Sequence, residues 1–231
     1  MKLQPFADIY AIAAERKGGE KALKKLLPKM SSKKALQQLG DDRYLSAMAQ
    51  GINQAGFSWK VIENKWPRFE EAFFGFDINK LVLLPDEKWE AYTQDKRVVR
   101  NWQKIKAVKD NLAFIYEIRR QHGSFGHWLA EWPTSDQIGL LKELKSKGSR
   151  LGGNTGQYFL RRVGKDGFIL SKDVCAALIR ANVDIKSSPT SQAEMKRVQA
   201  AFNEWHEETG LPYAHLSRIA GFSIGENYAN V

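Results

Sequence analysis

Hydrophobic positions recur at helical spacing along almost the whole of this 231-residue chain. Apolar residues three to five positions apart share one face of a helix, which is the usual mark of a core-facing stripe. No segment alternates apolar and polar residues as a half-buried strand does. The pattern therefore predicts an all-α protein of about ten short helices. The clearest stripes are Phe69, Phe73, Phe76, Leu81 and Leu84, and then Ile105, Val108, Leu112, Ile115 and Ile118.

Glycine- and proline-containing breakers separate the predicted helices. Several helix starts are marked by residues whose side-chain oxygen accepts from an unpaired first-turn N–H, namely Ser32, Ser135, and either Thr190 or Ser191. Beyond residue 190 the apolar spacing continues, which predicts a C-terminal helical extension over 190–231. This extension either closes one part of the fold or offers a surface to a partner.

Composition narrows the class of protein. The single cysteine, Cys175, excludes a disulfide framework and a multi-cysteine zinc site, fits a reducing compartment, and is expected to be buried. The chain has no run of 18 apolar residues and no apolar leader, so we expect a cytoplasmic protein without a membrane partner. The excess of 36 Lys and Arg over 26 Asp and Glu favours a polyanionic partner. His122 and His127 are five apart, off a common helix face, and we assign no metal and no cofactor.

Residues 145–160 are the most informative segment, with the sequence KSKGSRLGGNTGQYFL. A basic helix end, a glycine-rich bend and an apolar helix form a helix–hairpin–helix, whose backbone N–H groups near a helix N-terminus suit a phosphate. Basic flanks position a protein on DNA without reading its sequence. A plain helix–helix turn is the alternative. The candidate DNA-contacting residues are Lys147, Arg150, Gly152, Gly153, Thr155, Gly156, Gln157 and, further along, Lys172.

Four blocks of the sequence occur in a recognisable order. They are Asn53–Trp59 followed by Phe69–Phe73 and Phe76-Asp77, then Val99-Arg100 with Lys104–Ala107 and Asn111, then Leu151–Leu160, then Ser171–Val174. In this order they resemble the DNA-3-methyladenine glycosylase I family of the helix-hairpin-helix DNA glycosylase superfamily. The resemblance covers residues 45–178 and implies a divergent member with an all-α, two-lobed fold, in which 1–231 form one glycosylase unit. It also implies a hairpin and a pocket-side helix within 140–175, DNA bound through the hairpin, and a flipped base between the lobes.

The chain also departs from that family. The family's N-terminal Cys and Tyr-His have no counterpart in residues 6–19, and its His and Cys beside the pocket-side helix are Asp173 and Ala177 here, so its structural zinc is not expected. In that family an acidic residue recognises the methylated base, and the matching position here is Gly51, with Gln50 beside it. The superfamily's catalytic Asp falls on Ser171 and its lyase Lys on Gln157, which favours a monofunctional hydrolase.

Removing a base requires an extruded nucleotide, a stacking surface, and electrostatic stabilisation of a sugar that becomes cationic. The resemblance supports Trp59 as the stacking residue, where cation–π binding is available to a charged base, with Tyr10, Phe57 and Trp66 as weaker candidates. Core packing is the alternative for each aromatic residue. Gln54 and Asn53 either bind a base edge or satisfy backbone groups in a turn.

A carboxylate near the hairpin would stabilise the sugar cation and orient a water. Asp173 is the first choice and Asp166 the second, although Asp173 is also placed to cap the following helix.

Together these features predict a monofunctional DNA glycosylase of base-excision repair, cytoplasmic and nucleoid-associated. We expect it to act as a monomer on an alkylated purine, such as 3-methyladenine, in double-stranded DNA. The alternatives are a glycosylase for a different lesion, a DNA-binding module that has lost catalysis, as Gly51 and Ser171 suggest, and a helical scaffold without a DNA role.

Overall fold

The computed structural model describes residues 2–225 and divides the chain into two compact helical units. The hairpin unit comprises Ser31–Trp132 and Gly139–Lys165. The described residues of the terminal unit are 2–30, 133–138 and 166–225. The last positions of the predicted extension, 226–231, lie outside the described residues.

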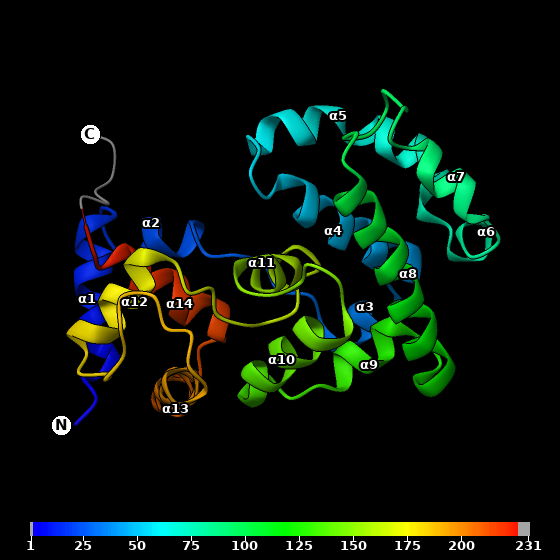
Figure 1. Ribbon diagram of the computed structural model, residues 1–231. Helices are drawn as coiled ribbons and strands as arrows, with labels where there is room; N and C mark the ends of the chain where they lie inside the picture. The colour runs from blue at the N-terminus through cyan, green and yellow to red at the C-terminus, as the bar shows by residue number, and fades with distance from the viewer. Residues whose placement is uncertain (1, 226–231) are drawn as a thin grey trace. The chain divides into compact units, whose positions relative to one another are not determined.

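Within the hairpin unit, α4 packs on both α8 and α11, and α3 packs on α9 (Figure 1). Both predicted stripes lie in its core, where every member except the half-buried Leu84 is buried. The elements are α3 (Lys33–Gln38), α4 (Asp41–Gln54), α5 (Trp59–Ala72), η1 (a 3₁₀ turn, Phe74–Phe76), α6 (Ile78–Leu81), α7 (Asp86–Ala91), α8 (Trp102–His122), α9 (Phe125–Glu131), most of α10 (Gln137–Lys147) and α11 (Asn154–Arg162).

In the terminal unit, α14 packs on α1 and α12, and two carboxylates from distant residues cap its helices. Glu208 on α13 accepts from the N–H of Phe6, at 2.9 Å, where Pro5 has no capping side chain. Asp166 accepts from the N–H groups of Tyr213, at 3.2 Å, and Ala214, at 2.8 Å. The elements are α1 (Phe6–Arg16), α2 (Glu20–Lys25), η2 (Thr134–Asp136), α12 (Lys172–Arg180), α13 (Gln192–Thr209) and α14 (Tyr213–Phe222).

The all-α prediction is confirmed, since no strand occurs among residues 2–225. The expected number of helices is too low, because several elements of only four to six residues bring the described α-helices to fourteen. Ser32 caps α3, as predicted. Of the two candidates Thr190 and Ser191, it is Ser191 that caps α13, in a capping box with Glu194. The prediction for Ser135 is wrong: it lies inside η2, which starts after Pro133 without a side-chain cap.

Cys175 is buried in the terminal unit, as expected. Burial raises the pKa of its thiol. In the part of the chain that the structure describes, no helix is both long and apolar enough to cross a membrane.

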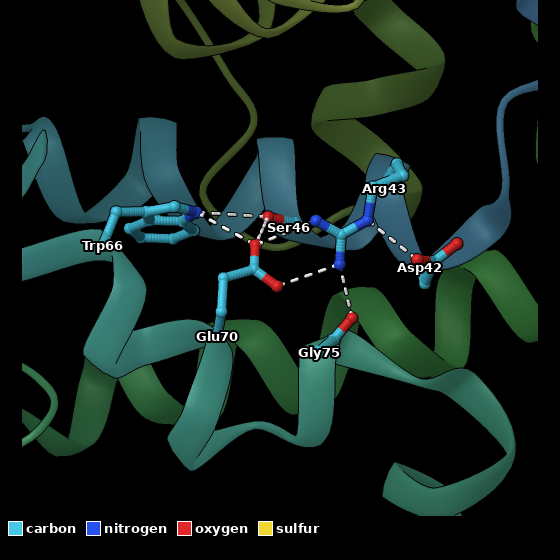
Figure 2. A network of polar contacts seen from close by, with 6 residues as sticks. All are labelled: Asp42, Arg43, Ser46, Trp66, Glu70 and Gly75. Carbon is cyan, nitrogen blue, oxygen red and sulfur yellow. Dashed lines mark hydrogen bonds and ion pairs between the residues drawn. The ribbon is translucent and has the colours of Figure 1, made fainter.

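A polar network joins α4, α5 and η1 in the hairpin unit (Figure 2). Arg43 makes a double hydrogen bond to the Glu70 carboxylate, at 3.0 and 2.9 Å, and also donates to the carbonyl oxygen of Gly75. Glu70 accepts in turn from Ser46, at 2.6 Å, and from Trp66 Nε1, at 3.2 Å. The network therefore holds η1, whose residues Phe74–Phe76 all have positive φ, against α4.

We expect Glu70→Ala to lower the free energy of unfolding by about 1–3 kcal/mol, because three donors lose their acceptor in a partly buried site. Chemical denaturation would measure this loss. The matched control is Glu71→Ala on the same helix: its side chain is 68% exposed and pairs with Arg97, so its loss should change stability by about 0.5 kcal/mol or less. Equal losses in the two variants would contradict a special role for the network.

Candidate functional site

The predicted hairpin lies between α10, which ends at Lys147, and α11, which begins at Asn154. Arg150 and Gly153 both have positive φ, +58° and +57°. Gly153 is the residue before the first turn of α11, and it has no side chain to cap the first N–H groups. A Cβ at Gly153 would meet no atom within 4 Å, so this backbone is open for the approach of another group.

Two contacts from the rest of the hairpin unit fix the hairpin backbone. The side chain of Asn111 on α8 donates to Ser149 O and accepts from Ser149 N, both at 2.9 Å. On the other side, a Cβ at Gly156 would overlap the carbonyl oxygen of the buried Leu151. Gly156 is therefore required for close packing of α11 on the hairpin, and Gln157 beside it is also buried.

Lys104, on α8, holds the C-terminal end of α4. Its ammonium group donates to the carbonyl oxygens of Asn53, at 3.0 Å, and Ala55, at 2.8 Å, and lies 4.5 Å from the ring centroid of Phe57. Burial, with a smaller contribution from the nearby Arg150 charge, lowers the pKa of Lys104. Phe57 is 47% exposed. The amide of Asn53 donates to Ala49 O within α4, so this side chain is turned to its own helix.

Trp59, the first residue of α5, is 46% exposed and is therefore not a core residue. Its ring makes an edge-to-face contact with Tyr158 on α11, at 5.0 Å between centroids and 88° between planes. Trp66, a weaker candidate, is half-buried and stacks on Phe69 and Phe76 against the core instead. Trp59 thus offers ring surface beside a helix that starts at the hairpin.

Arg162 lies one turn beyond Tyr158 on the same face of α11 and reaches α4. Its Nη2 donates to Gln54 Oε1 at 2.5 Å, and its Nη1 donates to Ala47 O at 3.3 Å. A Cβ at Gly51 would lie 3.4 Å from Arg162 Nη1 and 3.6 Å from Thr155 Cγ2. We call Gly51, Gln54, Trp59, Tyr158 and Arg162 the α4–α11 cluster.

The structure distributes the predicted site residues over both units. Gln54, Phe57, Trp59 and the hairpin residues belong to the hairpin unit, whereas Tyr10, Lys172 and Asp173 belong to the terminal unit. Lys172 is exposed, and Tyr10 is half-buried against the core of its unit.

The start of α12 settles one of the two alternatives for Asp173. Capping by Asp173 is wrong, because Ser171 caps α12 by accepting from the N–H of Val174. Asp173 lies in the first turn and is half-buried. Asp166, the second-choice carboxylate, is instead committed to the N-terminus of α14.

Three residues of this region were not predicted from sequence: Lys104, which holds the end of α4, Tyr158, which contacts Trp59 on α5, and Arg162, which contacts α4. A usable signal existed for the last two, since Thr155, Tyr158 and Arg162 follow helical spacing on one face of α11. Nothing in the sequence connects that face to Gly51, which is more than a hundred residues away.

The sequence model of the family described as methyladenine glycosylase matches residues 36–164, more than half of the chain. This chain belongs to the methyladenine glycosylase family. Membership supports a DNA glycosylase for alkylated bases. The matched range includes α4, the hairpin and α11, and ends just after Arg162.

Solved structures of DNA glycosylases share the fold. The 8-oxoguanine DNA glycosylase of Methanocaldococcus jannaschii has a TM-score of 0.56 at 16% identity, covering 91% of this chain and 90% of that one. In complex with DNA containing 8-oxoguanine, that enzyme gives a TM-score of 0.52 at 15% identity over 92% and 95% of the chains. 3-Methyladenine DNA glycosylase I from Staphylococcus aureus gives 0.50 at 20% identity over 78% and 100%. The predicted helix-hairpin-helix glycosylase fold is confirmed.

We expect Gly156→Ala to lower the free energy of unfolding by about 1–3 kcal/mol, because the added methyl group overlaps backbone rather than a flexible side chain. Thermal or chemical unfolding would measure it. Gly152→Ala is the matched control in the same hairpin, since its methyl group would meet only the flexible Lys145 side chain, at 3.3 Å. A fully stable Gly156→Ala variant would show that α11 does not depend on this close approach.

Proposed function

We propose that this family member is a monofunctional DNA glycosylase that hydrolyses the N-glycosidic bond of an alkylated purine, such as 3-methyladenine, flipped out of duplex DNA. The single observation that carries the proposal is the exposed Trp59 ring, held against Tyr158 on the helix that follows the hairpin. Exposing a large aromatic ring is costly unless something stacks on it, and a flipped base has the required flat face.

In this proposal the hairpin holds the DNA backbone. The N–H groups at the start of α11 lie where Gly153 leaves open space, and Arg150 brings positive charge to the same segment. Lys147 lies at the end of α10 beside it and is paired with Glu143 at 2.6 Å. Such contacts position the duplex without reading its sequence. The buried Gly156 and Gln157 support the hairpin from within, so their contribution is structural.

Asp173 is the carboxylate that we assign to catalysis. Because Ser171 is the cap of α12, the Asp173 carboxylate is not required for that role. Its negative charge would stabilise the sugar cation formed as the C1′–N bond breaks and its electron pair moves to the base, and would orient the water that adds to C1′. The two units would together form one glycosylase. The buried Gln157 at the position of the superfamily's lyase lysine supports simple hydrolysis.

The decisive experiment is the release of free bases from alkylated duplex DNA by the purified protein, resolved by chromatography. We expect release by the wild type and a loss of about 100-fold or more in Trp59→Ala and in Asp173→Asn. Both variants should bind undamaged duplex nearly as well as the wild type. If no free base is released while salt-dependent binding of duplex DNA is retained, the protein is a DNA-binding module without this activity. Equal loss of release and of folding in Trp59→Ala would assign Trp59 a structural role.

The hairpin makes a separate prediction. We expect Gly153→Val to weaken duplex binding, because a side chain there blocks backbone approach and strains a positive φ. In Arg150→Gln, which loses one phosphate contact, the decrease of log affinity with log salt concentration should be shallower by about 0.9. Gly210→Val, at another open position with positive φ, controls for strain alone and should bind normally. Unchanged affinity of a folded Gly153→Val would exclude the hairpin from DNA binding.

A further inference from the structure

Both helices of the hairpin connect it to the terminal unit. The first, α10, begins at Gln137 in that unit, and the chain that follows α11 enters the same unit at Asp166. From there it leads to α12, whose first turn contains Asp173. We call residues 163–171 the α11–α12 connector. This connector is the direct covalent path from the hairpin to the carboxylate that we assign to catalysis.

The side chain of Gln137 pairs with the connector backbone at Phe168. Its Nε2 donates to the carbonyl oxygen of Phe168 at 2.8 Å, and its Oε1 accepts from the N–H of the same residue at 2.7 Å. A Cβ at Gly167 would lie 2.6 Å from Oε1, so the missing side chain there lets the amide approach. Gln137 is buried, and burial of an amide is costly unless both its polar atoms are paired, as they are here.

Other contacts hold the connector as well. In the hairpin unit, Lys165 donates to the carbonyl oxygen of Trp132 at 2.6 Å. In the terminal unit, the N–H of Ile169 donates to Ser217 on α14 at 3.1 Å. These contacts join the connector to residues outside the hairpin helices. The Gln137 contact differs, because Gln137 is the first residue of α10: it closes a ring through α10, the hairpin, α11 and the connector.

We propose that Gln137 is a positioning residue: by fixing the α11–α12 connector at Phe168, it couples Asp173 to the hairpin that holds the DNA. The inference rests on the proposed function and adds to it a residue that acts through the backbone. A closed ring leaves the start of α12 fewer positions relative to the hairpin than an open connector would. Precision matters there, because a misplacement of about 1 Å at a reacting group can cost about 100-fold in rate.

The hydrogen bonds of Gln137 should matter for the rate of base release and not for binding. Gln137 lies at the end of α10 remote from the hairpin, so its loss leaves the hairpin backbone and its contacts with phosphate in place. In Gln137→Met, we expect the single-turnover rate of base release from alkylated duplex to fall by about 10- to 100-fold. The dissociation constant of the same duplex should change by about twofold or less, since phosphate contacts dominate it.

Gly167→Ala tests the same pair with Gln137 in place. Its methyl group would displace the Gln137 amide, and we expect the same loss of rate. Because both substitutions break one interaction, the double variant should be no slower than either single variant. Glu208→Ala is the matched control in the terminal unit: it removes the acceptor at the start of α1, and the folded variant should release bases at the wild-type rate. A wild-type rate in folded Gln137→Met, or losses that multiply in the double variant, would overturn the proposal.

A distance measurement tests the coupling without requiring catalysis. Spin labels are attached to Ser146→Cys, at the hairpin end of α10, and to Ile179→Cys on α12, in a Cys175→Ala background. Ser146 and Ile179 are both exposed, so the labels do not disturb the core. We expect a narrow distance distribution that broadens in Gln137→Met and not in Glu208→Ala.

The two proposals fail in different ways. A wild type that releases no base, with a distance distribution that broadens in Gln137→Met, would contradict the hydrolase and support the coupling. A distribution that stays equally narrow in folded Gln137→Met would overturn the coupling, whatever the activity of the protein.

Discussion

The pair of hydrogen bonds between Asn111 and the backbone of Ser149 is the constraint on which the candidate DNA surface depends. A bend rich in glycine loses much conformational entropy when it is fixed, and little of its own side-chain packing can offset that loss. Asn111 belongs to α8, whose buried stripe is part of the core of the hairpin unit. Core packing is thereby transmitted to a loop whose own contribution to the core is the buried side chain of Leu151.

The position of Trp59 follows from the same helix. Lys104, two turns before Asn111 on α8, holds the last carbonyl groups of α4, so the chain leaves α4 at a fixed point and begins α5 at Trp59. A charged side chain is expensive to bury, and here it satisfies carbonyl groups that a helix C-terminus leaves unpaired. The hairpin and the aromatic ring are therefore positioned by one rigid element.

The features that could be predicted from the sequence are mostly local ones. Helical stripes, the caps Ser32 and Ser191, and the hairpin follow from residues close together in the chain, where spacing decides geometry. The prediction failed at Ser135 because a proline-led 3₁₀ turn precedes α10. The capping alternative for Asp173 failed because Ser171, two residues earlier, caps α12. The contact of Arg162 with Gln54 spans 108 residues, and only the packing of α11 on α4 creates it.

That long-range contact differs from the contacts that define the fold. The core and the hairpin constrain many residues at once, so they preserve the glycosylase architecture at identities near 20%. The contact of α11 with α4 at Arg162 depends on two positions, an absent side chain at Gly51 and a guanidinium at Arg162. Changing either leaves the apolar stripes intact, because neither residue belongs to them. This contact can therefore change with few substitutions while the core and the hairpin stay as they are.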